Sequence, residues 1–86
     1  MTKDMRYDTP SWVLINNGTR YVVYCEKKSS FGNTAIVKTP AGYWAVVHHI
    51  NAYSPMINSE MHGDWNHGHY FMEDKQKAIR YYEGVK

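Results

Sequence analysis

The Asn17-Gly18 dipeptide, which separates two short runs of β-forming residues, constrains the fold of this chain more than any other feature. Asn-Gly favours a two-residue hairpin turn, because both residues tolerate positive φ angles. The runs on either side, SWVLI (residues 11–15) and RYVVYCE (residues 20–26), are therefore predicted to pair as antiparallel strands.

The run over residues 20–26 carries apolar side chains on both of its faces. Strand alternation places three of them on one face, namely Tyr21, Val23 and Cys25. A strand that is apolar on both sides is expected in the middle of a sheet. Two further strands follow after short connections, which favours an antiparallel meander. The expected elements are a loop over 27–33, a strand over 34–39, a turn over 40–42 with Pro40 at its second and Gly42 at its fourth position, a strand over 43–50 and a short fifth strand over 69–72.

Residues 73–86 contain the clearest helical pattern. Asp74 is a predicted N-cap, and Gly84 is a predicted stop. One face of this helix is expected to pack on the sheet, with Ile79 and Tyr82 as anchors. Ala78 shares that face, and the residues expected to face water are Lys77, Arg80 and Tyr81.

The fold expected for residues 1–86 is a single small α+β domain. It has an antiparallel meander of four to five strands, with the C-terminal helix packed on one face. Residues 1–10 are expected to form a loosely held arm, and residues 51–68 a long irregular loop of the kind that carries function. The single cysteine excludes an internal disulfide, and the chain has no signal-peptide or membrane-spanning pattern. A reduced, cytoplasmic setting is therefore expected.

Three histidines and an aspartate lie within HGDWNHGHYF (residues 62–71). His62, Asp64, His67 and His69 are the residue types that bind zinc, but their spacing matches none of the usual zinc motifs. The run is interpreted as a binding loop or turn, with no cofactor. A metal-binding domain, or a metal-dependent hydrolase or nuclease centred on these residues, is the alternative.

The stretch from Thr39 to Ser59 contains no Asp, Glu, Lys or Arg. Its second half is too rich in Asn, Ser and Pro to be core, yet it carries large apolar side chains. Uncharged loops with aromatic and Met anchors are typical of the centre of a protein–protein interface. We expect exposed side chains in this half and in the adjoining histidine-rich run, above all Tyr53, Met56 and Trp65. The complete set of predicted partner-binding residues is Tyr53, Met56, Ile57, Trp65 and Tyr70.

The net charge of +2 is too small to indicate nucleic-acid binding by itself. The residues that would support such a module are Lys75, Lys77, Arg80 and Tyr81 on the helix, and this is a third hypothesis. The leading hypothesis is a non-enzymatic protein that binds a protein partner or a second copy of itself, away from membranes. In size and Asn/Tyr/Met-rich composition, though in no motif, the chain resembles small inhibitors that bacteriophages use against host or defence proteins. That resemblance implies occlusion of a site on a larger partner.

Overall fold

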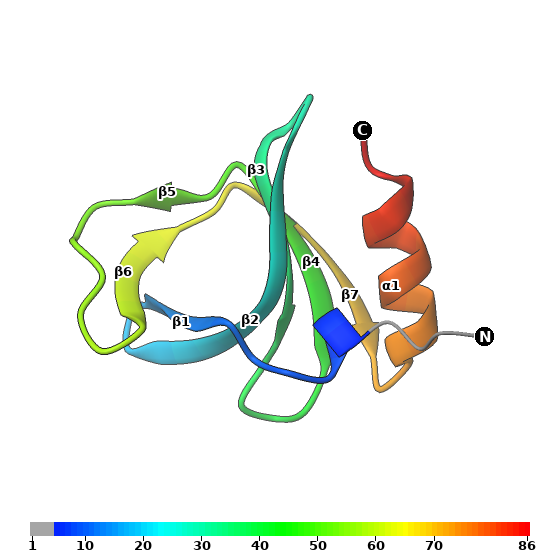
Figure 1. Cartoon of the computed structure of the whole chain (residues 1–86), viewed down its shortest axis with the longest axis horizontal. Helices are drawn as coiled ribbons and strands as arrows, with labels where there is room; N and C mark the ends of the chain where they lie inside the picture. Colours follow the sequence, from blue (N-terminus) through cyan, green and yellow to red (C-terminus); the bar gives the residue numbers. More distant parts are fainter. Residues whose placement is uncertain (1–4) are drawn as a thin grey trace.

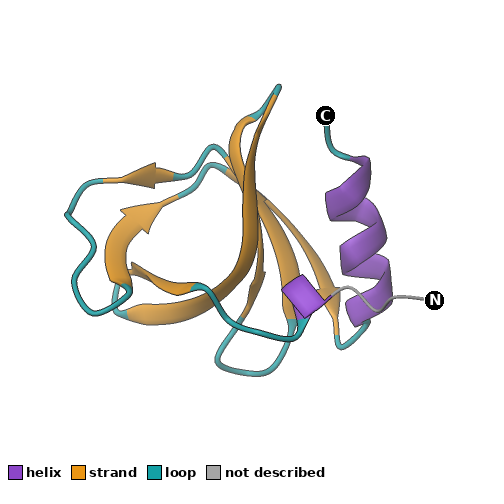
Figure 2. Ribbon diagram, viewed as in Figure 1, coloured by secondary structure: helices purple, strands orange, loops and turns teal. Residues whose placement is uncertain are grey.

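The computed structural model describes residues 5–86 of the chain (Figures 1 and 2). A strongly curved sheet forms most of the molecule, and a single α-helix packs on its outer face. The elements in chain order are η1 (Met5–Tyr7), β1 (Trp12–Asn16), β2 (Thr19–Ser29), β3 (Gly32–Lys38), β4 (Trp44–His48), β5 (Asn51–Ala52), β6 (Glu60–Asp64), β7 (His67–Met72) and α1 (Lys75–Gly84).

The seven strands form one sheet in the order β5-β6-β1-β2-β3-β4-β7. All neighbours are antiparallel except β1 and β6, which are parallel. The predicted α+β class, the β1–β4 meander and the helix on one face are confirmed. The predicted count of four to five strands was too low.

The missing strands lie in the segment that was predicted to be an irregular loop. Residues 51–52 and 60–64 form β5 and β6, and β7 begins at His67 instead of residue 69. β5 is only two residues long, and β6 pairs with a strand that lies more than forty positions earlier, Val13 facing Glu60. Neither strand is marked in the sequence by a regular spacing of hydrophobic residues, because each strand forms by pairing with a segment that is distant in sequence.

The predicted loop over residues 27–33 is also mostly strand. β2 continues to Ser29 and β3 starts at Gly32, so only Ser30 and Phe31 form the hairpin tip. The Lys and Ser residues of this segment indicated a loop, but pairing with β3 extends the strand. The two turns predicted from sequence are confirmed. Asn17 and Gly18 have φ angles of 50° and 82°, and the amide of Gly42 donates to the carbonyl of Thr39 at 2.9 Å.

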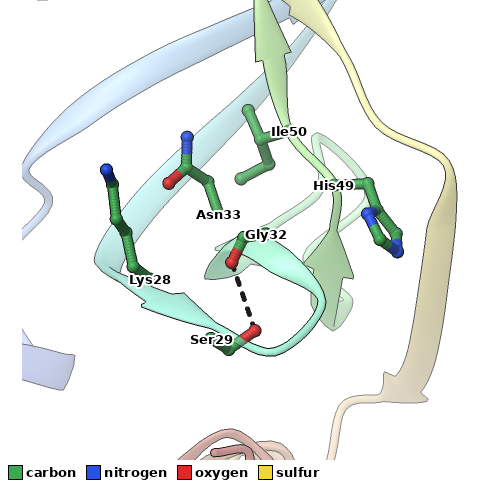
Figure 3. A pocket seen from close by; sticks show the side chains of 6 residues that line it. All are labelled: Lys28, Ser29, Gly32, Asn33, His49 and Ile50. Carbon is green, nitrogen blue, oxygen red and sulfur yellow. Dashed lines mark hydrogen bonds between the residues drawn. The ribbon is translucent and has the colours of Figure 1, made fainter.

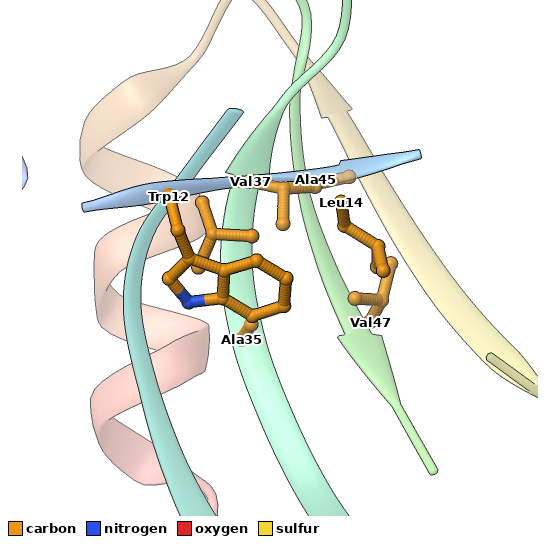
Figure 4. Close-up of a cluster of buried hydrophobic side chains, with 7 residues drawn as sticks. Trp12, Leu14, Ala35, Val37, Ala45 and Val47 are labelled. Atoms are coloured by element: carbon orange, nitrogen blue, oxygen red, sulfur yellow. The ribbon is translucent and has the colours of Figure 1, made fainter. Parts of the chain in front are cut away.

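The concave face of the sheet encloses the larger core cluster, shown in Figure 4. Small and β-branched side chains alternate on β3 and β4, and the indole of Trp12 fills the space over them. Trp65 and Tyr21 pack at the margin of this cluster. Its buried members are Trp12, Leu14, Val23, Ala35, Val37, Ala45 and Val47.

A second cluster lies between the convex face of the sheet and α1. Its buried members are Tyr7, Ile36, Trp44, Val46, Ala78 and Tyr82. Cys25 packs against this cluster, whereas alternation had placed it on the same face as Val23. A register shift between Val23 and Cys25 explains the difference, because one extra residue in a strand reverses the side-chain directions that follow.

The N-terminal segment is held more firmly than a loose arm. Residues 1–4 of that predicted arm lie outside the described residues. Tyr7 is buried, and its hydroxyl donates to the carboxylate of Glu83 on α1 at 2.9 Å. Burial and this hydrogen bond raise the pKa of Tyr7.

The helix begins as predicted. The carboxylate of Asp74 accepts a hydrogen bond from the amide of Lys77 at 3.0 Å, which is an N-cap contact. The described helix is shorter than residues 73–86, and Gly84 is its last residue. Ala78 and Tyr82 are buried against the sheet, while the predicted anchor Ile79 is only partly buried.

Tyr82 is therefore expected to stabilise the docked helix more than Ile79. Tyr82→Ala should lower the free energy of unfolding by about 3 kcal/mol or more, because it empties a large buried site. Ile79→Ala should cost roughly half as much. Denaturant titrations followed by circular dichroism would measure both, with the exposed Arg80→Ala as control. Equal losses for Ile79 and Tyr82 would contradict this packing.

Gly63 marks the closest approach between β6 and its neighbours. A Cβ atom at this position would lie 2.8 Å from the carbonyl oxygen of Asn51 and 2.9 Å from a methyl carbon of Leu14. Gly63→Ala should therefore destabilise the protein by about 1–3 kcal/mol, the usual range for overpacking. Gly84→Ala is the matched control, because a Cβ there meets open space. A thermal melt of Gly63→Ala that matches wild type would show that β6 can move away from Leu14.

Candidate functional site

The segment from residue 53 to residue 59 links the edge strand β5 to β6 and lies at the far left of Figure 1, opposite α1. Its tip is a tight hairpin. The amide of Ile57 donates to the carbonyl of Glu60 at 2.8 Å, and the amide of Glu60 donates to the carbonyl of Ile57 at 2.9 Å. Asn58 and Ser59 between them have φ angles of 53° and 61°. Two positive φ angles in a two-residue turn are characteristic of type I′.

Three more hydrogen bonds hold the loop to the rest of the sheet. The amide of Val13 on β1 donates to the carbonyl of Ser59 at 2.8 Å, and the amide of Tyr53 donates to the carbonyl of His62 at 3.1 Å. The amide of His62 donates to the hydroxyl of Ser54 at 2.9 Å. The loop conformation is thus fixed by folding, and ordering it would add little to the cost of binding.

Three large apolar side chains of this loop are exposed. Tyr53 is 62% exposed, Met56 is 46% exposed and Ile57 is 67% exposed. These three residues are called the loop surface below. A hollow of about 220 Å³ lies beside Ile57. Its lining residues are Ile15, Ser54, Pro55, Ile57, Asn58, Glu60 and His62.

An ion pair between Arg20 and Glu60 lies next to the loop surface. The hydrogen bond from Arg20 lowers the pKa of the Glu60 carboxyl, and the same bond raises the pKa of Arg20. The side chain of Arg20 is 53% exposed and that of Glu60 is 36% exposed, so solvent screens the pair and it adds little to stability. It supplies a polar border to an apolar patch, the usual arrangement at the rim of an interface.

The five residues predicted to bind a partner divide between two places. Tyr53, Met56 and Ile57 form the loop surface, whereas Tyr70 lies on β7, at the other end of the sheet order, and is 55% exposed. Tyr53 and Met56 are exposed, as expected. Trp65 is partly buried, contrary to expectation, because its ring packs edge-to-face on Tyr21 with centroids 4.7 Å apart. Trp65 is therefore part of the core margin.

The predicted metal residues are not gathered at one point. His62 and Asp64 lie on β6, which pairs with β1 and β5, whereas His67 and His69 lie on β7, which pairs with β4. Among residues 5–86, no three His, Cys, Asp or Glu side chains are arranged to hold a metal ion. Asp64, His67 and His69 are all exposed.

The four helix residues considered for nucleic-acid binding are also engaged differently from one another. Lys75 pairs with Asp8 at 2.7 Å and lies over the ring of Trp44. The hydroxyl of Tyr81 is hydrogen-bonded to His48. Lys77 and Arg80 remain exposed. Lys75 and Tyr81 are thus engaged within the fold, whereas Lys77 and Arg80 are not buried.

His48 is the polar group that sequence reasoning placed on a strand but did not connect to a network. It is 3% exposed, and both of its ring nitrogens are hydrogen-bonded. Nδ1 lies 2.9 Å from the hydroxyl of Thr34, and Nε2 lies 3.0 Å from the hydroxyl of Tyr81. The sequence held no signal for this network, because its members come from β3, β4 and α1.

The network determines the tautomer of His48. The hydroxyl of Ser29 donates to the carbonyl of Gly32, which can only accept. Thr34 must then donate to Ser29, 2.8 Å away, so its oxygen accepts from Nδ1–H of His48. Nε2 is left to accept the proton of the Tyr81 hydroxyl. Neutral His48 thus satisfies every partner and joins β3 and β4 to α1.

Burial lowers the pKa of His48, and the neighbouring His69, His49 and His67 lower it further. Phe31 covers the same ring, with centroids 5.1 Å apart. Beside it, a hollow of about 460 Å³ lies at the β2–β3 hairpin and is shown in Figure 3. His49 lies on the opposite side of this hollow from Lys28. The lining residues are Lys28, Ser29, Gly32, Asn33, His49 and Ile50, with no carboxylate among them.

Comparisons with models of known protein families, with curated proteins and with solved structures find no match to this chain. No helix within residues 5–86 is long and apolar enough to cross a lipid bilayer.

Acid is expected to destabilise the protein through His48. An unfolded histidine has a pKa of about 6.5, and the folded value is lower, so the unfolded state binds more protons as pH falls below about 6.5. The free energy of unfolding should fall between pH 7.5 and pH 5.5, by at most about 1.4 kcal/mol per pH unit for one proton. His48→Gln should show a smaller fall in denaturant titrations at the two pH values. An unchanged pH dependence in that variant would assign the effect to other groups.

Proposed function

We propose that this chain is a small protein-binding domain that acts by occupying a site on a larger partner protein, without catalysing a reaction. The observation that supports this most directly is the loop surface. Tyr53, Met56 and Ile57 are exposed on a main chain that backbone hydrogen bonds hold in place. Single exposed apolar residues are ordinary, but three on one ordered, uncharged loop are typical of binding surfaces.

The loop surface has the features that favour affinity in a small interface. Its conformation is set before binding, so the partner need not supply the free energy of ordering it. A protruding hairpin tip with large apolar side chains can enter a concave site, and Arg20 and Glu60 provide a polar border. This geometry supports occlusion of a cleft, the mode of action that the compositional resemblance to phage inhibitors also implies.

Two potentially reactive groups, His48 and Cys25, are engaged within the fold, and this supports the proposal of a domain that does not catalyse a reaction. Both ring nitrogens of His48 are occupied within the fold. Cys25 is half-buried, and its thiol lies 3.6 Å from the carbonyl oxygen of Arg6. Neither residue has the open, polar setting that a nucleophile or general base needs.

Ile57→Asp is expected to weaken the partner complex by about 2 kcal/mol or more, which is roughly thirtyfold in Kd. A charged group at the most exposed apolar position of the loop would be desolvated on binding. The tagged wild-type protein would be used to capture its partner from the native cell, and mass spectrometry would identify it. Calorimetry on the purified pair would then give the two dissociation constants.

Tyr43→Asp is the matched control, because Tyr43 is also exposed but lies in the β3–β4 turn. It should bind the partner with wild-type affinity. Circular dichroism would verify that both variants are folded. If Tyr43→Asp weakens the complex while Ile57→Asp does not, the contact lies elsewhere and the loop surface is not the binding site.

A further inference from the structure

β7 is the long open edge of the sheet. It lies at one end of the strand order, where β4 is its neighbour, and β5 at the opposite end has only two residues. Five of the six residues of β7 are exposed. The amide and carbonyl groups on the outer side of such a strand are oriented to pair with another strand.

The composition of β7 does nothing to prevent that pairing. Natural edge strands are usually protected by Lys, Pro or other charged residues, whereas His67–Met72 contains no Pro and no Asp, Glu, Lys or Arg. Tyr70 is 55% exposed and Met72 is 57% exposed. The one irregularity is a register shift near Phe71, where β4 passes from Trp44 to Ala45. From His67 to Tyr70 the ladder is regular.

The helix covers the convex face of the sheet and does not occupy the outer, hydrogen-bonding side of β7. α1 packs on the convex face, over Ile36 on β3 and Val46 on β4. The ring of Tyr81 on α1 also lies against His69 and Phe71 on the convex side of β7, with centroids 4.6 and 5.5 Å apart. In Figure 4, β7 forms the right margin of the sheet, and α1 lies behind β2 and β3 on the other side of the view. An added strand would therefore meet β7 without displacing the helix.

We infer that two copies of this chain associate through their β7 strands, which pair antiparallel across a two-fold axis. The occupant must supply an extended strand of similar length that brings no charge opposite β7, and β7 itself meets both requirements. The other edge, β5, is too short to continue the sheet. Pairing therefore stops at a closed dimer and does not propagate into a fibre.

Symmetry limits the register of this pairing. In an antiparallel pair, residues opposite each other point to the same face of the sheet. Under two-fold symmetry, one residue of β7 must therefore lie opposite the same residue of the other copy, and the axis passes between these two. Centring the axis on His69 keeps the contact within the regular part of β7. Tyr70 of each copy then lies opposite Gly68 of the other, beside the Trp65 and Tyr70 rings that flank this glycine within its own chain.

The dimer and the loop surface do not compete. The loop between β5 and β6 lies at one end of the horizontal long axis in Figure 1, and β7 lies towards the other end. Association through β7 would therefore present two loop surfaces at once. The inference rests on the sheet edge alone and is independent of the function proposed for the loop surface.

The expected contact is small, so the dissociation constant should lie in the micromolar range. Sedimentation equilibrium of the full chain from about 5 to about 500 µM should show a monomer–dimer equilibrium that high salt does not weaken, because no charges are paired. His69→Lys should raise the dissociation constant at least tenfold, since it places like charges opposite each other. His69→Gln is the matched control and should dimerise like wild type.

Disulfide crosslinking tests the register. In a Cys25→Ser background, His69→Cys should form a crosslinked dimer on mild oxidation, whereas Tyr53→Cys should not. A protein that stays monomeric at about 500 µM would overturn the inference, including the case in which β7 binds a strand of another protein. So would a dimer that Ile57→Asp disrupts and His69→Lys leaves intact, because the two copies would then meet through the loop surface.

Discussion

Burial of β3 and β4 on both faces is the constraint on which the rest of the structure depends. Ala35, Val37, Ala45 and Val47 face the concave core, while Ile36 and Val46 lie under the helix. Two apolar faces need two covers. The curled strands β1, β2 and β6 provide one cover, and α1 with η1 provides the other. In so short a chain, no other element can replace either cover, so the loss of one cover would expose the apolar face beneath it.

The curl of the sheet follows from how the concave face is filled. Alanines alternate with valines on β3 and β4, which leaves room for the Trp12 indole and allows the strands to bend around it. β6 then returns beside β1 in parallel, so close that Gly63 has no room for a side chain. Only Trp65 and Asn66 separate β6 from β7, although the two strands lie near opposite ends of the sheet order.

The sequence predicted those parts of the fold that depend on local chemistry. Asn17-Gly18, Pro40 and Asp74 each act within a few residues, and their turns and cap were predicted in place. The remainder depends on contacts between distant segments. The parallel pairing of Val13 with Glu60 has no local pattern, and the bulge that redirects Cys25 is determined by the neighbouring strand.

The candidate site was predictable in part for the same reason. The exposure of Tyr53 and Met56 follows from an uncharged stretch too polar to be core, and that can be seen in the composition. The role of Trp65 cannot be seen in the composition, because a tryptophan next to a glycine-rich turn is compatible with a binding loop and with the margin of a core. Its ring lies on Tyr21, which is distant in sequence. The His48 network could not be predicted from the sequence either, because Thr34 and Tyr81 belong to other elements.

Stability and binding are thus assigned to different parts of the molecule. The two cores draw on β1–β4, α1 and η1, and the loop surface contributes no fully buried side chain to either of them. Its order comes instead from hydrogen bonds of the loop main chain and of the Ser54 hydroxyl, none of which uses the side chains of Tyr53, Met56 or Ile57. Asn58 and Ser59 adopt positive φ angles that cost free energy in a residue other than glycine, and the bonds between Ile57 and Glu60 offset that cost. The side chains of Tyr53, Met56 and Ile57 are therefore free to vary for binding, because the fold depends on the main chain at these three positions.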